Sequence, residues 1–191
     1  MVARQLKTII FSAFAMAALS VGSTALAAPD FEAAQELELL YGDGDAVHEP
    51  GLPQAGMLRV YWFWSAVSSC SERAEPGIES LVSAFPDVEV IVVHSNADEE
   101  VDEARDVASS RQVGAPIYRD EGALLADIFN ATMTPEVVVV DHTGVIYQGR
   151  PVKVGRRSME SYVEDIAARW RASEEIERDY RRPTGCPIRR P

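Results

Sequence analysis

Cysteine is scarce in this chain, whose 191 residues include only Cys70 and Cys186. The three histidines, His48, His94 and His142, show no metal-ligand spacing with one another or with the cysteines. A copper site built on a Cys-x-x-x-Cys pair with a histidine is also excluded, because the pair is missing. The sequence therefore predicts no metal site and no cofactor.

Positive charge is also in short supply, with 18 basic residues against 30 acidic ones and a net charge of -12. Proteins that bind nucleic acids in general rely on basic groups to neutralise phosphates, so this class is excluded. No Gly-x-Gly-x-x-Gly or Gly-x-x-x-x-Gly-Lys-Ser/Thr stretch is present, which removes the common nucleotide-binding fingerprints. After residue 27 no run of about 18 apolar residues occurs that would span a membrane.

The first 27 residues have the pattern of a cleaved export signal. Arg4 and Lys7 form a positive start, residues 9–21 are apolar and rich in alanine, and Ala25-Leu26-Ala27 offers the small residues of a cleavage site. A retained N-terminal anchor is the alternative. Export predicts a periplasmic or secreted protein, in a compartment where disulfides persist.

The remaining part of roughly 160 residues is long enough for one domain with a normal core. We expect an N-terminal extension over 28–57, a domain over 58–172 and a C-terminal tail over 173–191. Within the extension, residues 31–40 are expected to form an amphipathic helix. From Tyr180 onward the tail contains four arginines and no acidic residue. A basic tail is expected to dock on the acidic domain through electrostatic attraction.

Predicted strands and helices alternate along residues 58–172. Strands are expected at 58–64, 88–94, 116–118, 136–140 and 145–148, and helices at about 69–85, 99–111, 123–130 and from 158 onward. Strand–helix–strand units imply a parallel core, and the last two strands form an antiparallel hairpin. This order predicts an α/β thioredoxin-like sandwich, a mixed central sheet with helices on both faces. The acidic run Asp98-Glu99-Glu100 is expected to lie on a solvated helix face.

Cys70 stands where an apolar strand runs into the start of a helix. Ser68, Ser69 and Ser71 are expected N-cap residues, whose hydroxyl oxygens accept hydrogen bonds from the first amides of that helix. A thiol at this point meets the partial positive charge of the helix N-terminus, which favours the thiolate. With Cys186 on the tail, the pair suggests either redox chemistry or a structural clasp.

Several short stretches resemble the redoxin group of the thioredoxin superfamily, which includes the alkyl hydroperoxide reductase/thiol-specific antioxidant proteins. They are Phe63-Trp64-Ser65, Ser68-Ser69-Cys70, His94-Ser95-Asn96-Ala97-Asp98-Glu99, Thr134-Pro135 and Gly185-Cys186-Pro187-Ile188-Arg189. The second, third and fifth stretches are similar to an exported peroxiredoxin-like branch of that group.

The resemblance implies a cis-proline at Pro135 that faces Cys70. Thr134 and Pro135, together with Ser68 and Ser69, would then bind substrate, and Cys70 and Cys186 would be the catalytic thiols. The implied substrates are protein thiols and disulfides or peroxides, with an unidentified electron donor.

The chain departs from the family at its dithiol. Ser68 and Ser71 occupy the positions of a Cys-x-x-Cys pair, and serine cannot form the mixed disulfide that such a pair resolves. A peroxiredoxin site would have Thr or Ser at position 67 and proline at 63, where this chain has Val67 and Phe63. Two functions stay open: an exported thiol-disulfide oxidoreductase or peroxiredoxin-like protein that uses Cys70 and Cys186, or a non-catalytic binding or structural module. In the second, a Cys70–Cys186 disulfide would stabilise the chain by about 4–5 kcal/mol.

Overall fold

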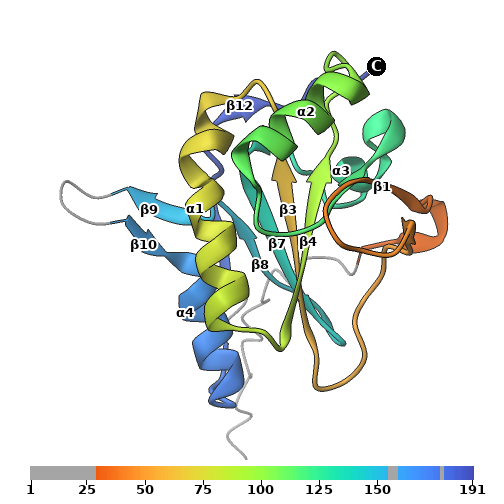
Figure 1. Ribbon diagram of the computed structural model, residues 1–191. Helices are drawn as coiled ribbons and strands as arrows, with labels where there is room; N and C mark the ends of the chain where they lie inside the picture. Colours follow the sequence, from red (N-terminus) through yellow and green to blue (C-terminus); the bar gives the residue numbers. More distant parts are fainter. Residues whose placement is uncertain (1–28, 155–158, 177–178) are drawn as a thin grey trace, which may run out of the picture.

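The computed structural model describes residues 29–154, 159–176 and 179–191 (Figure 1). The expected export signal at 1–27 lies outside these residues. A mixed sheet of eight strands, in the order β11-β8-β7-β3-β4-β5-β1-β2, forms the centre of the molecule. Its strands are β1 (Leu37–Tyr41), β2 (Val47–His48), β3 (Leu58–Trp64), β4 (Val88–His94), β5 (Ile117–Arg119), β7 (Glu136–Asp141), β8 (Gly144–Gly149) and β11 (Asp179–Arg181).

The centre of this sheet is parallel, as the sequence predicts. β3 pairs in parallel with β4, and β4 with β5, while β7 runs antiparallel to β3 and continues into the β7–β8 hairpin. The alternating aromatic residues of β3 face opposite sides, and Trp62 and Trp64 are fully buried as expected of core residues. The carboxyl ends of β3 and β4 therefore lie side by side, and the loops that follow them share one end of the molecule.

Helices cover both faces of the sheet, which confirms the predicted sandwich. One face carries α1 (Ser69–Ala84), α2 (Val101–Arg111) and α4 (Tyr162–Arg171), and the other carries α3 (Leu124–Ile128) with the short 3-10 turns η1 (Phe31–Ala33) and η2 (Glu121–Ala123). Ile78 and Leu81 of α1 pack in the same core cluster as Trp62. Leu125 of α3 packs with Phe63 on the opposite face.

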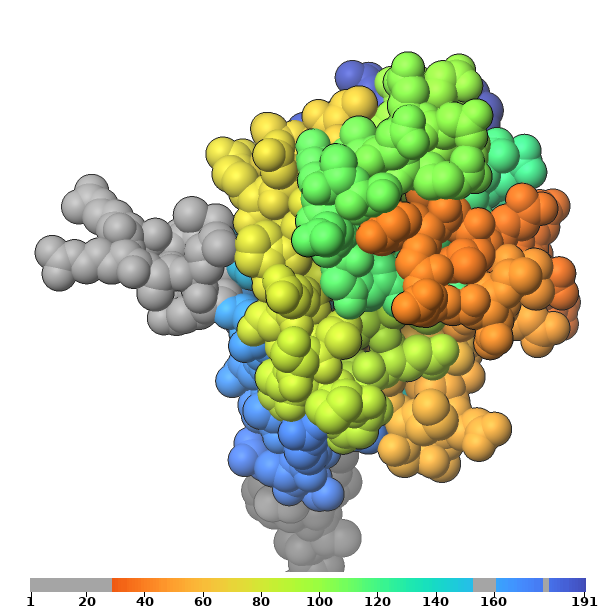
Figure 2. Space-filling view, in the orientation of Figure 1, coloured from red at the N-terminus to blue at the C-terminus, as the bar shows by residue number. Residues whose placement is uncertain are grey.

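The predicted helix at 31–40 is wrong. Only residues 31–33 are helical, and residues 37–41 form β1, which pairs antiparallel with β5 at the edge of the parallel core. A β-bulge between Leu39 and Tyr41 adjusts the register, while Leu37 and Leu40 are both buried. Because β5 has an open edge, pairing with it satisfies backbone groups that an isolated short helix would leave to solvent. Figure 2 shows this red-to-orange segment lying along one side of the molecule.

Two helix starts also differ from the prediction. Residues 159–161 form the short strand β10 (Met159–Ser161), paired with β9 (Val152–Val154), and Ser161 caps α4 by accepting a hydrogen bond from the Glu164 amide at 3.1 Å. The helix expected from 99 begins at Val101, and no side chain caps its start.

The tail folds back onto the domain and ends against α3 and the loop before α2. Its strand β12 (Cys186–Pro187) pairs antiparallel with β6 (Met133–Thr134), which precedes β7. The dark blue C-terminal residues in Figures 1 and 2 accordingly lie at the same end of the molecule as the yellow start of α1. Arg190 contacts Asp127 of the domain at 2.6 Å, so the basic tail does lie on the domain, while the electrostatic cause of its docking stays a prediction.

None of the helices in the described part of the chain has the length and apolar character needed to cross a bilayer. The division of the chain at residues 28, 58 and 173 stays a prediction, although β1 and β2 of the extension are strands of the central sheet.

Candidate functional site

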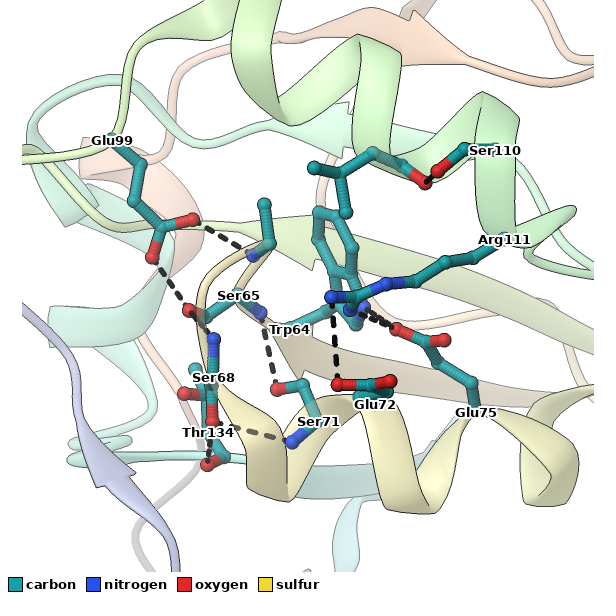
Figure 3. Close-up of polar contacts among 12 residues, drawn as sticks. Trp64, Ser65, Ser68, Ser71, Glu72, Glu75, Glu99, Ser110, Arg111 and Thr134 are labelled. Carbon is teal, nitrogen blue, oxygen red and sulfur yellow. Dashed lines mark hydrogen bonds and ion pairs between the residues drawn. The ribbon is translucent and has the colours of Figure 1, made fainter.

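Serine hydroxyls organise the turn between β3 and α1. Ser68 is the N-cap of α1, as predicted, and its Oγ accepts a hydrogen bond from the Ser71 amide at 3.2 Å. Ser71 Oγ in turn accepts from the Ser65 amide at 3.2 Å, and Ser65 Oγ accepts from the Ser68 amide at 3.1 Å (Figure 3). The two serines at the Cys-x-x-Cys positions are thus buried and hydrogen-bonded, Ser68 as the helix cap and Ser71 to the amide of Ser65. The other two expected caps, Ser69 and Ser71, lie within the helix, and Ser69 is its exposed first residue.

Cys70 is the second residue of α1 and is half-buried. The Arg73 guanidinium, one turn further along the helix, donates a hydrogen bond to Cys70 Sγ at 3.4 Å. Cys70 is therefore partly accessible to solvent and has a cationic side chain beside its sulfur.

Cys70 opens onto a pocket of about 340 Å³. The helix start, the segment after β8 and the tail all contribute to its wall, which is lined by Cys70, Arg73, Ala74, Pro135, Arg150, Pro151, Val152, Thr184 and Gly185. The Thr134–Pro135 peptide bond is cis, as the resemblance implies. The pocket is of a size that takes a small molecule or a single side chain.

Thr134 joins the predicted site residues to one another. Its carbonyl oxygen accepts a hydrogen bond from Ser68 Oγ at 3.5 Å, and its side chain is buried. Of the four residues predicted to bind substrate, Pro135 lines the Cys70 pocket, while Thr134 and Ser68 lie behind it. Ser69 is not among the residues that line the pocket.

The tail brings Cys186 to this site. Cys186 is the register partner of Thr134, and Thr134 Oγ1 donates a hydrogen bond to the Cys186 carbonyl at 3.4 Å. Gly185, the preceding residue, lines the pocket that contains Cys70. Cys70 and Cys186 are both free thiols here, and both are partly exposed. Cys186 itself is not among the residues that line the pocket, but it directly follows one that is.

A buried carboxylate behind the site was not expected. Glu99, predicted on a solvated helix face, has a side chain that is only 5% exposed. Its Oε1 accepts hydrogen bonds from Ser65 Oγ at 2.5 Å and Asn96 Nδ2 at 2.8 Å. Its Oε2 accepts from the Ala66 amide at 2.8 Å and lies 3.1 Å from His94 Nε2. The prediction for Glu99 is therefore wrong, because the carboxylate turns inward to satisfy the donors of the β3–α1 turn.

The electrostatics of Glu99 follow from these donors. Burial by itself raises the pKa of a carboxyl, but the hydrogen bonds from His94, Ser65 and Ala66 outweigh that effect and hold the pKa of Glu99 below its ordinary value of 4.5. Glu99 is consequently ionised at neutral pH and serves as a fixed acceptor for the turn.

A second buried carboxylate supports the proline side of the site. Glu136 is 1% exposed, and its Oε2 accepts hydrogen bonds from the Thr132 and Met133 amides at 2.9 and 3.2 Å. Gln148 Nε2 donates to Glu136 Oε1 at 3.0 Å. These hydrogen bonds hold β6 in place, and β6 in turn pairs with the tail strand β12. In the sequence, the burial of Glu136 was indicated only by its position at the start of a valine-rich strand.

A second pocket among the described residues can be compared with the Cys70 pocket as a candidate site. A larger pocket of about 550 Å³ lies between α4 and β11, but it contains no cysteine, and its charged residues already pair with one another or face solvent. Within the described residues, no three His, Cys, Asp or Glu side chains are grouped closely enough to hold a metal ion. The Cys70 pocket is the better candidate, because a cysteine lines its wall.

The sheet order, the helices on both faces and the cis-proline beside a cysteine at a helix start define a thioredoxin-like fold. Comparison with solved structures agrees. An uncharacterised conserved protein from Geobacillus kaustophilus superposes with a TM-score of 0.68 at 16% identity, over 81% of this chain and 87% of that one.

Two further similar structures have described activities. The bacterioferritin comigratory protein of Xanthomonas campestris, described with an alkyl peroxide reduction activity, has a TM-score of 0.58 at 15% identity, over 81% of this chain and 99% of its own. A secreted Mycobacterium tuberculosis disulfide oxidoreductase homologous to E. coli DsbE has a TM-score of 0.53 at 17% identity, over 72% of this chain and 95% of its own. At these identities the likeness concerns the fold, and it confirms the resemblance to thioredoxin-like redoxins at that level.

The comparisons by sequence gave no further relative: no protein-family model matches the chain, and no curated protein does.

Proposed function

We propose that this chain is an exported thiol oxidoreductase in which Cys70 is the attacking thiol and Cys186 its partner. The observation that carries the proposal is the placement of Cys186 on a strand paired with Thr134, next to the pocket that Cys70 and Pro135 line. The export signal predicted at 1–27 supports a periplasmic or secreted location.

With a disulfide substrate, the Cys70 thiolate attacks one sulfur and forms a mixed disulfide, while the other substrate sulfur leaves as a thiolate and takes up a proton. The Cys186 thiolate then attacks the Cys70 sulfur and releases the second substrate thiol. The substrate gains two electrons and two protons, and the protein is left with a Cys70–Cys186 disulfide. A thiol electron donor must reduce this disulfide before the next turnover.

A peroxide substrate uses the same two thiols. The Cys70 thiolate attacks the terminal peroxide oxygen, which leaves a sulfenic acid on Cys70 and releases an alcohol or water. Cys186 attacks that sulfenic sulfur, a water molecule leaves, and the same disulfide results. The proposed substrate classes are therefore disulfides of proteins and peroxides, and both need the same donor.

The arrangement of the serines supports a partner outside the helix. Ser68 and Ser71 are serines whose buried hydroxyls hydrogen-bond within the β3–α1 turn, so α1 itself offers no second thiol to Cys70. A mixed disulfide without a resolving thiol persists until another thiol attacks it. Cys186 is the only other cysteine of the chain, and its pairing with Thr134 supports a role as that second thiol.

The competing function is a structural clasp, in which the disulfide only pins the tail. The clasp is disfavoured because several non-covalent contacts already hold residues 188–190 on the domain. The Ile188 amide donates to Thr132 O at 2.9 Å, the Arg189 amide donates to Asn96 Oδ1 at 2.8 Å, and the Ile188 side chain is buried. A tail held in this way does not need a covalent bond to stay in place.

The experiment that tests the proposal is a redox titration of the purified chain, with peptide mapping under non-reducing conditions to identify the linkage. A Cys70–Cys186 bond that a dithiothreitol buffer reduces easily, together with insulin or peroxide turnover that is lost in Cys70→Ser, is the expected result. A bond with a potential below about -300 mV and no turnover would establish the clasp instead.

Turnover in the Cys186→Ser variant completes the test. We expect a single round of reaction, in which a mixed disulfide or sulfenic acid accumulates on Cys70, followed by arrest. Multiple turnovers at the wild-type rate would show that Cys186 has no part in the reaction.

A further inference from the structure

Glu99 lies between the two halves of the site. On one side its carboxylate holds the β3–α1 turn, through Ser65 Oγ and the Ala66 amide (Figure 3). On the other side it accepts a hydrogen bond from Asn96 Nδ2 at 2.8 Å. The turn leads into the helix of Cys70, whereas Asn96 contacts the tail of Cys186. The carboxylate is therefore bonded to the turn directly and linked to the tail through Asn96.

The orientation of the Asn96 side chain is fixed by its neighbours. Its Oδ1 accepts a hydrogen bond from the Arg189 amide at 2.8 Å. A backbone amide can only donate, so the amide oxygen of Asn96 must face Arg189 and its NH₂ must face Glu99. Asn96 itself is only 6% exposed, and solvent cannot easily replace either partner. Two consecutive hydrogen bonds, Asn96 to Glu99 and the Arg189 amide to Asn96, therefore connect Glu99 to the tail.

The tail backbone has a second bond at the same residue, since the Ala97 amide donates to the Arg189 carbonyl at 2.8 Å. Arg189 is therefore held on both its backbone groups by the loop that precedes α2. Cys186 lies three residues before this anchor, on a short strand whose own pairing spans only Cys186 and Pro187. A strand this short depends on its flanking contacts for a fixed position.

We propose that Glu99, acting through Asn96, is a positioning residue that holds the Cys186 strand against the Cys70 site. The effect of Glu99 on the reaction of the two cysteines rests on the function proposed above. Its effect on the position of the tail does not depend on that function. Glu99 does not touch the pocket, so its effect is on how often Cys186 is within reach of Cys70.

Reversing the hydrogen-bond polarity tests this directly. In Glu99→Gln, an NH₂ group replaces one of the two carboxylate oxygens. Where that NH₂ group points at Asn96, it meets the NH₂ group of Asn96, and two hydrogen-bond donors oppose each other. In Asn96→Asp, an oxygen faces the Glu99 carboxylate instead. In the double variant, the glutamine NH₂ donates to the aspartate, whose other oxygen still accepts from the Arg189 amide. The two single changes should loosen the tail, and the double change should restore it.

The first readout is the alkylation rate of Cys186 by iodoacetamide, measured in the Cys70→Ser background so that Cys186 is the only thiol. We expect each single change to raise this rate about tenfold, because a hydrogen bond to a charged group is lost, and the double change to bring it back. Glu100→Gln is the matched control, since Glu100 is the exposed neighbour of Glu99 and its side chain caps nothing. Val88→Ala, at the far end of β4, controls for a general loss of stability.

The second readout is the equilibrium between the Cys70–Cys186 disulfide and dithiothreitol, measured with both cysteines present. Each single change should shift it about tenfold toward the reduced form, and the double change should return it to the wild-type value. A merely structural role for Glu99 would lower stability without this restoration.

The outcomes separate the two proposals. If the wild-type protein forms no Cys70–Cys186 disulfide, the proposed function fails, while the alkylation rates still decide whether Glu99 positions the tail. Rates in Glu99→Gln and Asn96→Asp that equal those of Glu100→Gln overturn the positioning role. A double variant as reactive as the single ones overturns the route through Asn96.

Discussion

The backbone of Gly185 lies against the carbonyl oxygen of Thr134, with no room for a Cβ atom between them. The same carbonyl accepts the hydrogen bond from Ser68, and the Thr134 residue pairs with Cys186. The helix start, β6 and the tail thus meet around a single peptide group. Close approach of two backbones is the reason for glycine at position 185, whose φ is not positive.

The first prediction concerns Gly185→Ala. Because the added methyl group would overlap the Thr134 carbonyl, the tail must move away from β6, at a cost of about 1–3 kcal/mol. We expect faster amide hydrogen exchange in residues 186–190, measured by mass spectrometry, while β3 and β4 keep their protection.

Gly51→Ala is the control for this substitution. A Cβ atom at position 51 meets no other atom within 4 Å, so the exchange pattern should stay that of the wild type. Unchanged exchange in residues 186–190 of Gly185→Ala would contradict the close contact.

The second prediction compares two residues of the tail, Ile188 and Arg190. Ile188 is 6% exposed and packs in the core cluster of α3, whereas the side chains of the Arg190–Asp127 pair are 35% and 55% exposed. Burial of an aliphatic side chain outweighs an exposed ion pair, so Ile188→Ala should cost about 2–5 kcal/mol and Arg190→Ala about 0.2–1 kcal/mol. Urea unfolding of both variants measures the difference.

The comparison of Ile188→Ala with Arg190→Ala also shows whether apolar contacts or charge hold the tail on the domain. The excess of positive charge in the tail predicted an electrostatic attraction, but the apolar and backbone contacts are stronger. Raising the salt concentration to about 1 M should therefore leave the exchange protection of the tail nearly unchanged, since screening affects only the exposed pairs. Release of the tail by salt would show that charge is the main cause of docking.

The interior of the fold could be predicted from local sequence patterns. The strands at 58–64 and 88–94 are long, almost wholly apolar segments, and each is followed by polar residues that end it. The position of Cys70 at a helix start follows from the serines that precede it. The cis-proline was predicted from the resemblance of Thr134-Pro135 to the redoxins and not from any local pattern.

The periphery and the support of the site could not be predicted in this way. β1 and β12 owe their conformation to pairing with β5 and β6, which are distant in sequence, and short segments carry no periodicity that reveals such partners. Glu99 stands in an acidic run that is typical of a solvated surface. Its burial depends on Ser65 and Ala66, more than 30 residues earlier, whose donors only the folded turn brings to it.

The third prediction restores a local dithiol. Ser68→Cys combined with Ser71→Cys places a Cys-x-x-Cys pair at the start of α1, where a second thiol can resolve a mixed disulfide without the tail. The loss of the Ser68 cap should cost about 1 kcal/mol of stability. We expect insulin disulfide reduction by this variant to survive the further change Cys186→Ser, in contrast to the wild type. A folded variant with no such activity would show that the pocket does not admit a protein disulfide.

The last prediction concerns the pH dependence of stability that Glu99 contributes. Its pKa is lower in the folded chain than the ordinary value of 4.5, so the folded state binds fewer protons than the unfolded state at acid pH. The contribution is therefore fully present above about pH 4.5 and is lost as the pH falls through the lowered pKa of the folded state. Glu99→Gln, which cannot ionise, should be less stable than the wild type by about 1–3 kcal/mol at neutral pH.

Urea midpoints measured at a series of pH values check this difference. The midpoints of wild type and Glu99→Gln should converge as the pH falls well below 4.5, because the protonated carboxyl and the amide then offer similar hydrogen bonds. Glu100→Gln should follow the wild type throughout. A difference between wild type and Glu99→Gln that stays constant with pH would mean that packing, and not the ionised carboxylate, accounts for the role of Glu99 behind the two cysteines.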